Sequence, residues 1–372
     1  MSSAWRARAL INTTAFAHNA ARVRALAPSS AVIAVVKANA YGHGIAALAS
    51  VLDQADGLAV IDVAEAEALR GNRLKAEIMI LQGCNTAAEL DWCVQNNAAP
   101  VVVNSEQLAL LKANALQLDK LWLKLDSGMH RLGLSAAAVA EAAKALKAAG
   151  FKGRIGLLTH FACADDNAGF TQQQIDCFDQ VAAAVAFDDH SLANSAAIFE
   201  HPASHRGAVR PGIMLYGSSP FIGVRSAHDL GLQPVMTLQA KVAAIHALDA
   251  GEAVGYGLSW RAEAATQVAV VSAGYGDGVP RNLPSGTVVA VGEQLGCLVG
   301  RVSMDSCFVA FDPAASIGVG DIATIWGETA GGQVISVDVA AHASQTIGYE
   351  LLCRVAPRVP RLSVTAVGEL RD

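Results

Sequence analysis

Residues 32–44 read V-I-A-V-V-K-A-N-A-Y-G-H-G and predict a buried β-strand that ends at a lysine. The first five residues are apolar and mostly β-branched, as in a strand buried on both faces, and a polar turn with two glycines follows. An ammonium at the end of such a strand is costly to desolvate. We therefore expect Lys37 to be paired, neutral or covalently bonded, for example to an aldehyde cofactor as a Schiff base, unless its stem packs along the strand and its charge reaches water.

Apolar runs like this one recur along the first part of the chain, with helix-like segments between them. Among these segments, 135–149 is expected to start at Ser135 and end at Gly150, and 171–187 to start at Thr171. The alternation predicts a (β/α)8 TIM-like barrel over residues 10–232, with an open doubly wound sheet as the alternative. The lack of a G-x-G-x-x-G turn after the first strand argues against a dinucleotide-binding sheet. The runs are 32–36, 58–61, 77–81, 99–103, 121–125, 155–159, 190–193 and 209–215.

From about residue 233 the pattern changes to alternating apolar runs separated by Gly, Pro and Asp turns. This predicts a mostly β C-terminal domain over residues 233–372, joined by residues 1–9. One helix is expected near 338–347, with Asp338 as its N-cap. The expected strands are 237–245, 267–272, 287–291, 297–302, 306–311 and 321–326.

The composition narrows the classes of protein to which the chain can belong. Of its 372 residues, 53% are hydrophobic and 16% are charged, but no apolar run approaches the roughly 20 residues of a membrane span. A net charge of -6 argues against nucleic acid as the main partner. No signal peptide is visible, so we expect a cytoplasmic protein. Seven scattered cysteines without a C-x-x-C pair predict buried, reduced thiols rather than disulfides or a metal site.

Polar side chains follow the predicted barrel strands. The carboxyl ends of barrel strands meet at one face, which is where barrel enzymes hold their active sites. Taken singly, each residue has a structural explanation: His160 as a core histidine, Arg210 in an ion pair, and Tyr275 as an aromatic in a tight turn. Together they predict one site. The polar residues at the strand ends are Lys37, Asp62, Gln82, Asn104, Lys124, Asp126, His160, Asn194 and Ser195, with Arg210 in the last run.

The segment L-W-L-K-L-D-S-G-M-H-R-L-G, residues 121–133, places a second lysine in this region. The two-residue period of a strand puts Lys124 and Asp126 on one face, with Arg131 in the loop beyond. A buried ammonium near an arginine is repelled by it. Either Asp126 pairs with Lys124 inside the barrel, or the amine is modified into an anion.

At this point a family resemblance is clear. The segment A-V-V-K-A-N-A-Y-G-H-G resembles the cofactor-lysine motif of the alanine racemases, pyridoxal phosphate enzymes of fold type III. The ordered motifs extend from residue 32 to 350, nearly the whole chain. The other similar motifs are L-K-L-D-S-G-M-H-R-L-G, T-H-F-A, A-N-S-A-A, V-R-P-G-I-M-L-Y-G, A-G-Y-G-D-G, R-V-S-M-D and T-I-G-Y-E.

The resemblance implies a dimeric alanine racemase with shared active sites. Lys37 would carry pyridoxal 5'-phosphate and be the base on one face of the substrate, and Tyr275 of the partner subunit would be the base on the other. Lys124 would be a carbamylated lysine, an anion that pairs with Arg131. The remaining implied contacts are Arg210 to the pyridine nitrogen, Arg131 to the phenolic oxygen, Tyr41, Ser195, Gly212, Ile213 and Tyr349 to the phosphate, Asn194 to the cofactor site, His160 to Tyr275 and Arg210, and Met304 and Asp305, with Arg131, to the substrate.

Arg210 carries a further hypothesis. An arginine does not give up its proton at ordinary pH, so it cannot fully protonate the ring nitrogen as a carboxylic acid would. We expect a weaker electron sink and fewer side reactions such as transamination. One departure from the resemblance is Gly276, where the family often has alanine in G-Y-A-D-G; a looser turn is the expected effect.

Three other functions remain open. One is a related decarboxylase of the same two-domain plan, but decarboxylases of this fold are similar in having a glutamate at the ring nitrogen, and Arg210 argues against that hypothesis. Another is a non-catalytic pyridoxal phosphate carrier, which would leave the second domain unexplained. A broader alanine and serine racemase is the nearest alternative, because a pocket rejects an added hydroxyl poorly. The sequence does not decide whether D-alanine is made for the cell wall or broken down. His205 and Arg206 suggest no function, and a solvated loop is expected there.

Overall fold

The computed structural model describes residues 5–114 and 117–369. Residues 1–4, 115–116 and 370–372, which the predicted domains include, lie outside the described residues. The chain divides into two compact units. We call residues 20–40 and 49–215 the barrel unit, and residues 5–19, 41–48 and 216–369 the β unit. The predicted boundary at 232/233 stays a prediction.

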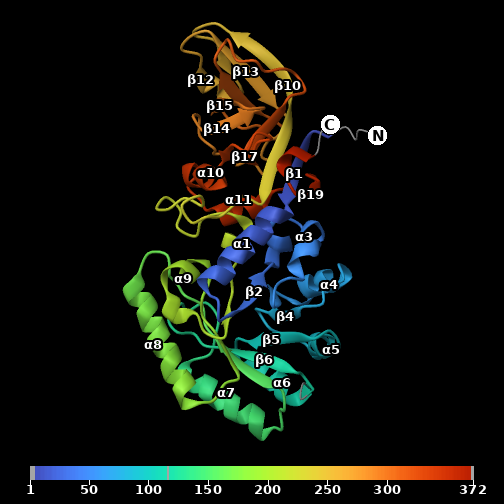
Figure 1. Ribbon diagram of the computed structural model, residues 1–372, viewed down its shortest axis with the longest axis vertical. Coiled ribbons are helices and arrows are strands. Elements are labelled where there is room, and N and C mark those ends of the chain that lie inside the picture. Colours follow the sequence, from blue (N-terminus) through green and yellow to red (C-terminus); the bar gives the residue numbers. More distant parts are fainter. Residues whose placement is uncertain (1–4, 115–116, 370–372) are drawn as a thin grey trace. The chain divides into compact units, whose positions relative to one another are not determined.

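The barrel unit confirms the predicted (β/α)8 architecture. Its parallel strands pair in sequence order, and the last pairs with the first to close the ring. Figure 1 shows helices α5 to α8 around the outside of these strands. The strands are β2 (Ala31–Val35), β3 (Gly57–Val60), β4 (Glu77–Ile80), β5 (Ala98–Val102), β6 (Lys120–Lys124), β7 (Arg154–Leu158), β8 (Asp189–Ser191) and β9 (Ala208–Val209).

The helices of the barrel unit follow the strands, as the alternating pattern predicts. Ser135 caps α7, and Gly150 follows its end with φ +90°, both as expected. The helix expected from Thr171 begins earlier, because Asn167 caps it and the Thr171 hydroxyl donates to the Asn167 carbonyl from inside the first turn. The helices are α4 (Val63–Gly71), α5 (Ala87–Gln95), α6 (Ser105–Asn114), α7 (Ala136–Ala148), α8 (Ala168–Ala184) and α9 (Ser195–Glu200), with the 3-10 turn Pro202–Ser204. Helices α1 (Thr13–Leu26), α2 (Lys37–Tyr41) and α3 (Ile45–Leu52) include residues assigned to both units.

The barrel interior is packed with side chains rather than hollow. Trp122, on the same face of β6 as Lys124, is fully buried. A Cβ at Gly156 on β7 would lie 2.4 Å from the Trp122 ring, so this indole requires a glycine on the neighbouring strand. No helix in the described part of the chain is both long enough and apolar enough to cross a membrane.

The β unit is mostly antiparallel, as predicted. Its sheet order is β18-β17-β14-β15-β16-β13-β10-β1-β19, and β10 also pairs with β17, which closes the central strands on themselves (Figure 1). The strands are β1 (Ala7–Asn12), β10 (Met236–Leu248), β13 (Thr266–Val271), β14 (Val288–Val291), β15 (Gln294–Val299), β16 (Cys307–Phe311), β17 (Ile322–Glu328), β18 (Val334–Ile335) and β19 (Arg361–Val364), with a separate hairpin of β11 (Ala253–Val254) and β12 (Trp260–Arg261). The 3-10 turns Tyr256–Leu258 and Val367–Glu369 also belong to this unit, and the turn Ile213–Tyr216 includes residues of both units.

The helix expected near 338–347 is the shorter α10 (Val337–Ala343), and a second helix that was not expected, α11 (Gly348–Arg354), follows it. Its predicted cap was wrong: Ser336 caps α10. Asp338 is inside the helix and buried, and its carboxylate accepts from the Ser218 hydroxyl at 2.5 Å and from the Ser219 amide at 2.9 Å. A tertiary contact therefore takes the carboxylate that the pattern assigned to capping.

The cysteines are all free thiols, as expected, but only three of the seven are buried. Cys84 and Cys93 lie with their sulfurs 3.4 Å apart, and Cys307 is also buried. Burial raises the pKa of the Cys307 thiol to about 12. Cys163 and Cys177 are half-buried, and Cys297 and Cys353 are exposed, so the expectation of buried thiols was wrong for these four positions.

Candidate functional site

Four of the predicted residues come together at the carboxyl ends of the barrel strands. Lys37 follows β2, Lys124 ends β6, His160 follows β7, and Arg210 follows β9. The positive charges of Arg210, Arg131, Lys124 and Lys37 all act on the imidazole of His160, which places these side chains around one point. The predicted convergence of strand ends therefore holds for this group.

Lys37 is half-buried and begins a left-handed turn. Ala38, Asn39 and Ala40 have φ values of 53°, 53° and 56°, and Tyr41 has φ 50°. L-residues, unlike glycine, avoid this left-handed region, and a run of them costs about 1–2 kcal/mol per residue. Backbone strain of this kind gathers at functional sites, where the surrounding structure imposes it.

Glu65 on α4 is one of the residues that impose this turn. Its Oε1 accepts from the Ala38 amide at 2.7 Å, and its Oε2 accepts from the Ile61 amide at 3.0 Å. The amide of Ala40 donates to the Val36 carbonyl at 2.8 Å. The lysine is thus at the start of a backbone segment that is fixed by hydrogen bonds from both sides.

Lys124 is 9% exposed, and burial lowers its pKa to about 8, with further lowering by Arg210, Arg131 and Lys37. The carboxylate of Asp126 does not serve it as a close partner. Asp126 instead accepts from the amides of Gly128 at 3.1 Å and His130 at 2.9 Å, and contacts the His130 ring at 3.0 Å. The expected ion pair between Lys124 and Asp126 is therefore not formed, and Asp126 holds the loop that follows it instead.

His160 is half-buried, and its pKa lies well below the usual value of 6.5. Desolvation is the largest cause, and the neighbouring cations act in the same direction. The imidazole is therefore neutral at neutral pH, with one ring nitrogen able to accept and the other able to donate. The explanation of His160 as an inert core histidine does not fit a ring surrounded by four cations.

Arg210 is 4% exposed and is held by backbone and hydroxyl oxygens. Its Nη1 donates to the Ser191 hydroxyl at 2.6 Å, and its Nη2 donates to the carbonyls of Thr159 at 2.5 Å and Leu192 at 3.3 Å. Burial lowers its pKa to about 10, so the guanidinium stays charged at neutral pH. Its Nε–H has no acceptor among the described residues and can therefore donate to a ligand.

Ser195 holds the segment that directly follows Arg210 in the sequence. The Ser195 hydroxyl oxygen accepts from the Gly212 amide at 3.0 Å and from the Met214 amide at 3.4 Å. Because the oxygen serves as acceptor to both, its own hydrogen is available to donate. Asn194 caps α9 through the Ala197 amide, so its side chain has a structural role in the described chain.

The β unit holds a cluster of aromatic rings around Tyr41. The Tyr41 ring stacks on Tyr216 with centroids 4.8 Å apart and lies 5.9 Å from the Tyr349 ring. His43 lies 4.6 Å from Tyr216. Burial, followed by Tyr349 and Cys353, raises the pKa of Tyr41, so its phenol stays protonated and can donate. Tyr216 is a packing partner that the strand-end argument did not single out, although it lies in the quoted V-R-P-G-I-M-L-Y-G segment.

Tyr275 also lies in the β unit, and 38% of its surface is exposed. Its amide donates to the Ser303 carbonyl at 3.0 Å, and the Gly276 amide donates to the Met304 carbonyl at 2.8 Å. Met304 is 53% exposed. The Tyr275 turn and the Met304–Asp305 segment are therefore neighbours with their side chains open to solvent.

Sequence reasoning missed three residues around this turn: Arg6, Asp277 and Arg358. Asp277 is fully buried and pairs with both arginines. The D of A-G-Y-G-D-G was a usable signal, because a carboxylate beside a glycine turn needs a cation when buried. The two arginines, far apart in sequence, gave none.

His205 and Arg206 do not form the expected solvated loop, because both are half-buried. Arg206 donates from Nη2 to both carboxylate oxygens of Asp179 on α8, at 3.1 and 2.9 Å. Its carbonyl accepts from the Ser30 hydroxyl at 2.7 Å. This segment ties the amino end of β9 to its surroundings, away from the strand ends that carry Lys37.

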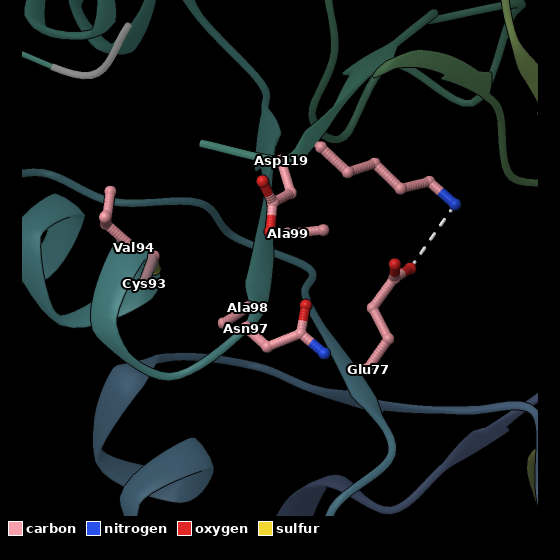
Figure 2. A pocket seen from close by; sticks show the side chains of 8 residues that line it. Glu77, Cys93, Val94, Asn97, Ala98, Ala99 and Asp119 are labelled. Atoms are coloured by element: carbon pink, nitrogen blue, oxygen red, sulfur yellow. Dashed lines mark ion pairs between the residues drawn. The ribbon is translucent and has the colours of Figure 1, made fainter. Parts of the chain in front are cut away.

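The amino ends of the barrel strands carry a separate charged group. Lys120 contacts Glu77 at 3.3 Å and Asp189 at 2.7 Å, and Arg154 contacts the same two carboxylates at 3.3 and 3.4 Å. Glu77, Asn97 and Asp119 line a small hollow of about 10 Å³ beside this group (Figure 2). At this end of a barrel such a balanced network closes the core rather than binding substrate.

Comparison with known proteins agrees with this geometry. The alanine racemase N-terminal domain family matches residues 11–220, and the alanine racemase C-terminal domain family matches residues 235–363. An alanine racemase of Polaromonas sp. is 42% identical and covers 95% of this chain and 97% of that protein. A biosynthetic alanine racemase of Pseudomonas aeruginosa is 43% identical over 95% of this chain and 98% of its own length.

Solved structures show the same likeness. The crystal structure of the biosynthetic alanine racemase from Pseudomonas aeruginosa matches with a TM-score of 0.90 and 41% identity, over 97% of this chain and 100% of that one. The alanine racemase from Acinetobacter baumannii matches with a TM-score of 0.90 and 36% identity, over 96% of this chain and 99% of that one. The similarity therefore covers both units.

Proposed function

Because the chain belongs to the alanine racemase family, we propose that it is an isomerase that interconverts L-alanine and D-alanine with pyridoxal 5'-phosphate. The observation that carries the proposal is the group of cations around a neutral His160 at the carboxyl end of the barrel. A barrel needs no such group for folding, because each buried cation lowers stability unless an anion joins it.

The barrel residues fit this cofactor. Its phosphate and phenolic oxygens supply anionic groups to a site rich in cations, and the unused Nε–H of Arg210 can donate to a ring nitrogen. When bound, pyridoxal phosphate acts as an electron sink that acidifies the α-carbon of an attached amino acid. Arg131 would donate to the phenolic oxygen, and Lys37 would hold the cofactor covalently.

The phosphate would be bound by hydroxyl and amide donors. Ser195 has a hydroxyl hydrogen available, and Tyr41 has a phenol that stays protonated. Gly212, Ile213 and Tyr349 complete the proposed set. The amide of Gly212 already donates to Ser195, so its contribution is to fix that hydroxyl. Asn194 would act through α9, which it caps.

Racemisation requires removal of a proton from one face of the α-carbon and return of a proton to the other. Lys37 would be one base, and Tyr275 of the partner subunit would be the other. The exposed Tyr275 and Met304 side chains support a shared site in a homodimer, because both are left uncovered in one chain. Met304 and Asp305, with Arg131, would bind the substrate carboxylate, and His160 would orient Arg210 and Tyr275.

Lys124 is proposed to be carbamylated. Only a neutral amine attacks carbon dioxide, and a pKa of about 8 leaves about a tenth of the amine neutral at pH 7, far more than an ordinary lysine. The carbamate would convert a cation repelled by Arg131 and Arg210 into an anion that attracts both. This change removes the electrostatic cost that burial of the ammonium imposes.

The substrate range is the finer part of the proposal. Alanine is favoured by the names of the relatives, and a broader alanine and serine racemase remains the second candidate, because an added hydroxyl is weakly rejected. The division into a cofactor-binding domain, 10–232, and a β domain, 233–372 with 1–9, belongs to the same proposal, as does a cytoplasmic location.

The test is a racemisation assay on the purified holoenzyme with each common L-amino acid in turn. We expect rapid loss of optical activity with L-alanine and slower loss with L-serine. Borohydride reduction should trap the cofactor on the peptide that contains Lys37. A protein that binds the cofactor but racemises neither amino acid would overturn the proposal.

A further inference from the structure

We propose that Asp277, Arg6 and Arg358 form a clamp that positions the Tyr275 turn, and that Gly276 belongs to it by leaving room for the Arg358 guanidinium. This inference rests on the proposed function, because it gives the clamp its purpose in holding Tyr275 as a base. None of the three charged residues touches the reacting atoms in this account, so they are positioning residues.

The centre of the clamp is the buried carboxylate of Asp277, which is 0% exposed. One oxygen accepts from Arg6 Nη2 at 2.5 Å and from Arg358 Nε at 2.9 Å. The other accepts from Arg6 Nη1 at 3.0 Å and from the Gly274 amide at 2.9 Å. Two cations and one amide at the start of the turn thus satisfy a carboxylate at its end, which fixes the peptide units on both sides of Tyr275.

Both arginines also reach the Met304–Asp305 segment. Arg6 Nη1 donates to the carbonyls of Ser272 at 2.8 Å and Asp305 at 3.0 Å. Arg358 Nη2 donates to the Asp305 carboxylate at 2.8 Å. Because the amides of Tyr275 and Gly276 pair with the carbonyls of residues 303 and 304, the clamp holds two neighbouring segments in one register.

Strand pairing supplies the arginines. Arg6 immediately precedes β1, and Arg358 lies shortly before β19, which pairs with β1 in parallel with Ala9 opposite Arg361. Residues from the two ends of the β unit are thereby delivered to one carboxylate. A planar guanidinium with several fixed donors suits this bridging role, and a lysine could not reproduce it.

The position of Arg358 explains why this chain has Gly276 where its family often has alanine. A Cβ at position 276 would lie 2.4 Å from Arg358 Nη2 and 3.0 Å from the Met304 carbonyl oxygen. Arg358 Nη2, which donates to Asp305, would have to shift to admit it. The glycine expected to loosen the turn therefore makes room for a guanidinium that restrains it.

The experiment compares Arg358→Met with the wild-type holoenzyme and with Arg354→Met as the matched control. Arg354 is also an exposed arginine, but its ion pair is with Glu350, outside the clamp. The first readout is hydrogen exchange at the amides of residues 275 and 276, which does not depend on activity. We expect exchange about ten-fold faster in Arg358→Met and unchanged in the control.

The second readout is the α-deuterium isotope effect on kcat for each enantiomer. The equilibrium constant of a racemisation is one, so kcat/KM falls equally in both directions, and the isotope effect identifies the weakened base. We expect kcat to fall on the order of ten-fold with little change in KM. The isotope effect should rise for the one enantiomer whose proton Tyr275 removes.

Double variants test the part played by Gly276. Gly276→Ala should speed exchange in the wild-type background and add little in the Arg358→Met background, because both changes remove the same contact. Unchanged exchange in Arg358→Met, equal isotope-effect changes for both enantiomers, or full additivity would overturn the clamp. Lack of racemisation by the wild-type holoenzyme would overturn the proposed function instead, and the exchange readout would still decide the clamp.

Discussion

At the scale of single residues, the site is defined by charges that the fold leaves without full compensation. His160 is kept neutral by desolvation and by the cations around it, while Arg210 stays charged and is held by three oxygen acceptors. These protonation states follow from position rather than residue type. They allow one side chain to accept and the other to donate at the same pH.

The pH dependence of stability follows from His160. An unfolded histidine takes up a proton near pH 6.5, whereas His160 in the folded chain takes it up only at much lower pH. Its contribution is therefore fully present above pH 6.5 and is lost as pH falls below it, by at most about 1.4 kcal/mol per pH unit. We expect His160→Gln to flatten the acid limb in urea titrations at pH 7, 6 and 5. An unchanged slope would show that other groups cause the acid loss.

Arg210→Glu should change which reaction the enzyme performs. A glutamic acid can share its proton with the ring nitrogen, as the arginine cannot, and so strengthen the electron sink. We expect racemisation to slow and pyruvate formation from alanine to increase on the order of ten-fold relative to it. Arg210→Gln is the control for loss of the guanidinium alone. Equal pyruvate formation in the wild type and the glutamate variant would refute this role of Arg210.

The positions of the site residues in the fold were predictable where those residues lie at the ends of predicted strands. Lys37, Lys124, His160 and Arg210 were all placed at the barrel face by the alternation of runs, and the structure brings them together. Asp126 was predicted to lie on the same face as Lys124, but its carboxylate turns to its own loop. The two-residue period predicts which face of a strand a side chain lies on, but it does not predict the side-chain contacts of residues in the loop after the strand.

At the scale of elements, the left-handed turn after β2 is the feature the sequence did not reveal. The segment A-N-A-Y contains one residue type, asparagine, that tolerates this backbone well. The turn is held because the Ala38 amide donates to Glu65, on a later helix, and the Ala40 amide donates to the Val36 carbonyl, directly after β2. Local propensity therefore could not predict it. The caps of α8 and α10 were misplaced for a related reason, since Asn167 and Ser336 compete with nearby candidates.

Glu65→Leu should release this turn. The substitution removes the acceptor of the exposed Ala38 amide and of the half-buried Ile61 amide, and loss of a typical hydrogen bond costs about 0.5–1.5 kcal/mol. We expect a lower free energy of unfolding in urea and weaker retention of the cofactor on dialysis. Glu67→Leu, at an exposed position on the same helix, is the matched control. If both variants retained the cofactor equally, Glu65 would have no part in holding the lysine turn.

At the scale of the whole molecule, each unit supplies groups that a single chain leaves open to solvent or to a ligand. The barrel unit gathers cations at its strand ends, and the β unit presents Tyr275 and Met304 on its surface. The architecture of both units was predictable because their strands and helices give regular patterns of apolar residues in the sequence. The clamp of Arg6, Asp277 and Arg358 was not, because it depends on the pairing of β1 with β19.

The central claim is that each active site combines Lys37 of one subunit with Tyr275 of the other. The most direct measurement is the activity of purified mixed dimers of Lys37→Ala and Tyr275→Phe chains, each inactive alone. In such a dimer one site lacks both bases and the other retains both, so we predict about half the wild-type activity per dimer. Mixed dimers as inactive as either parent would contradict the account, because they would show that both bases come from the same chain.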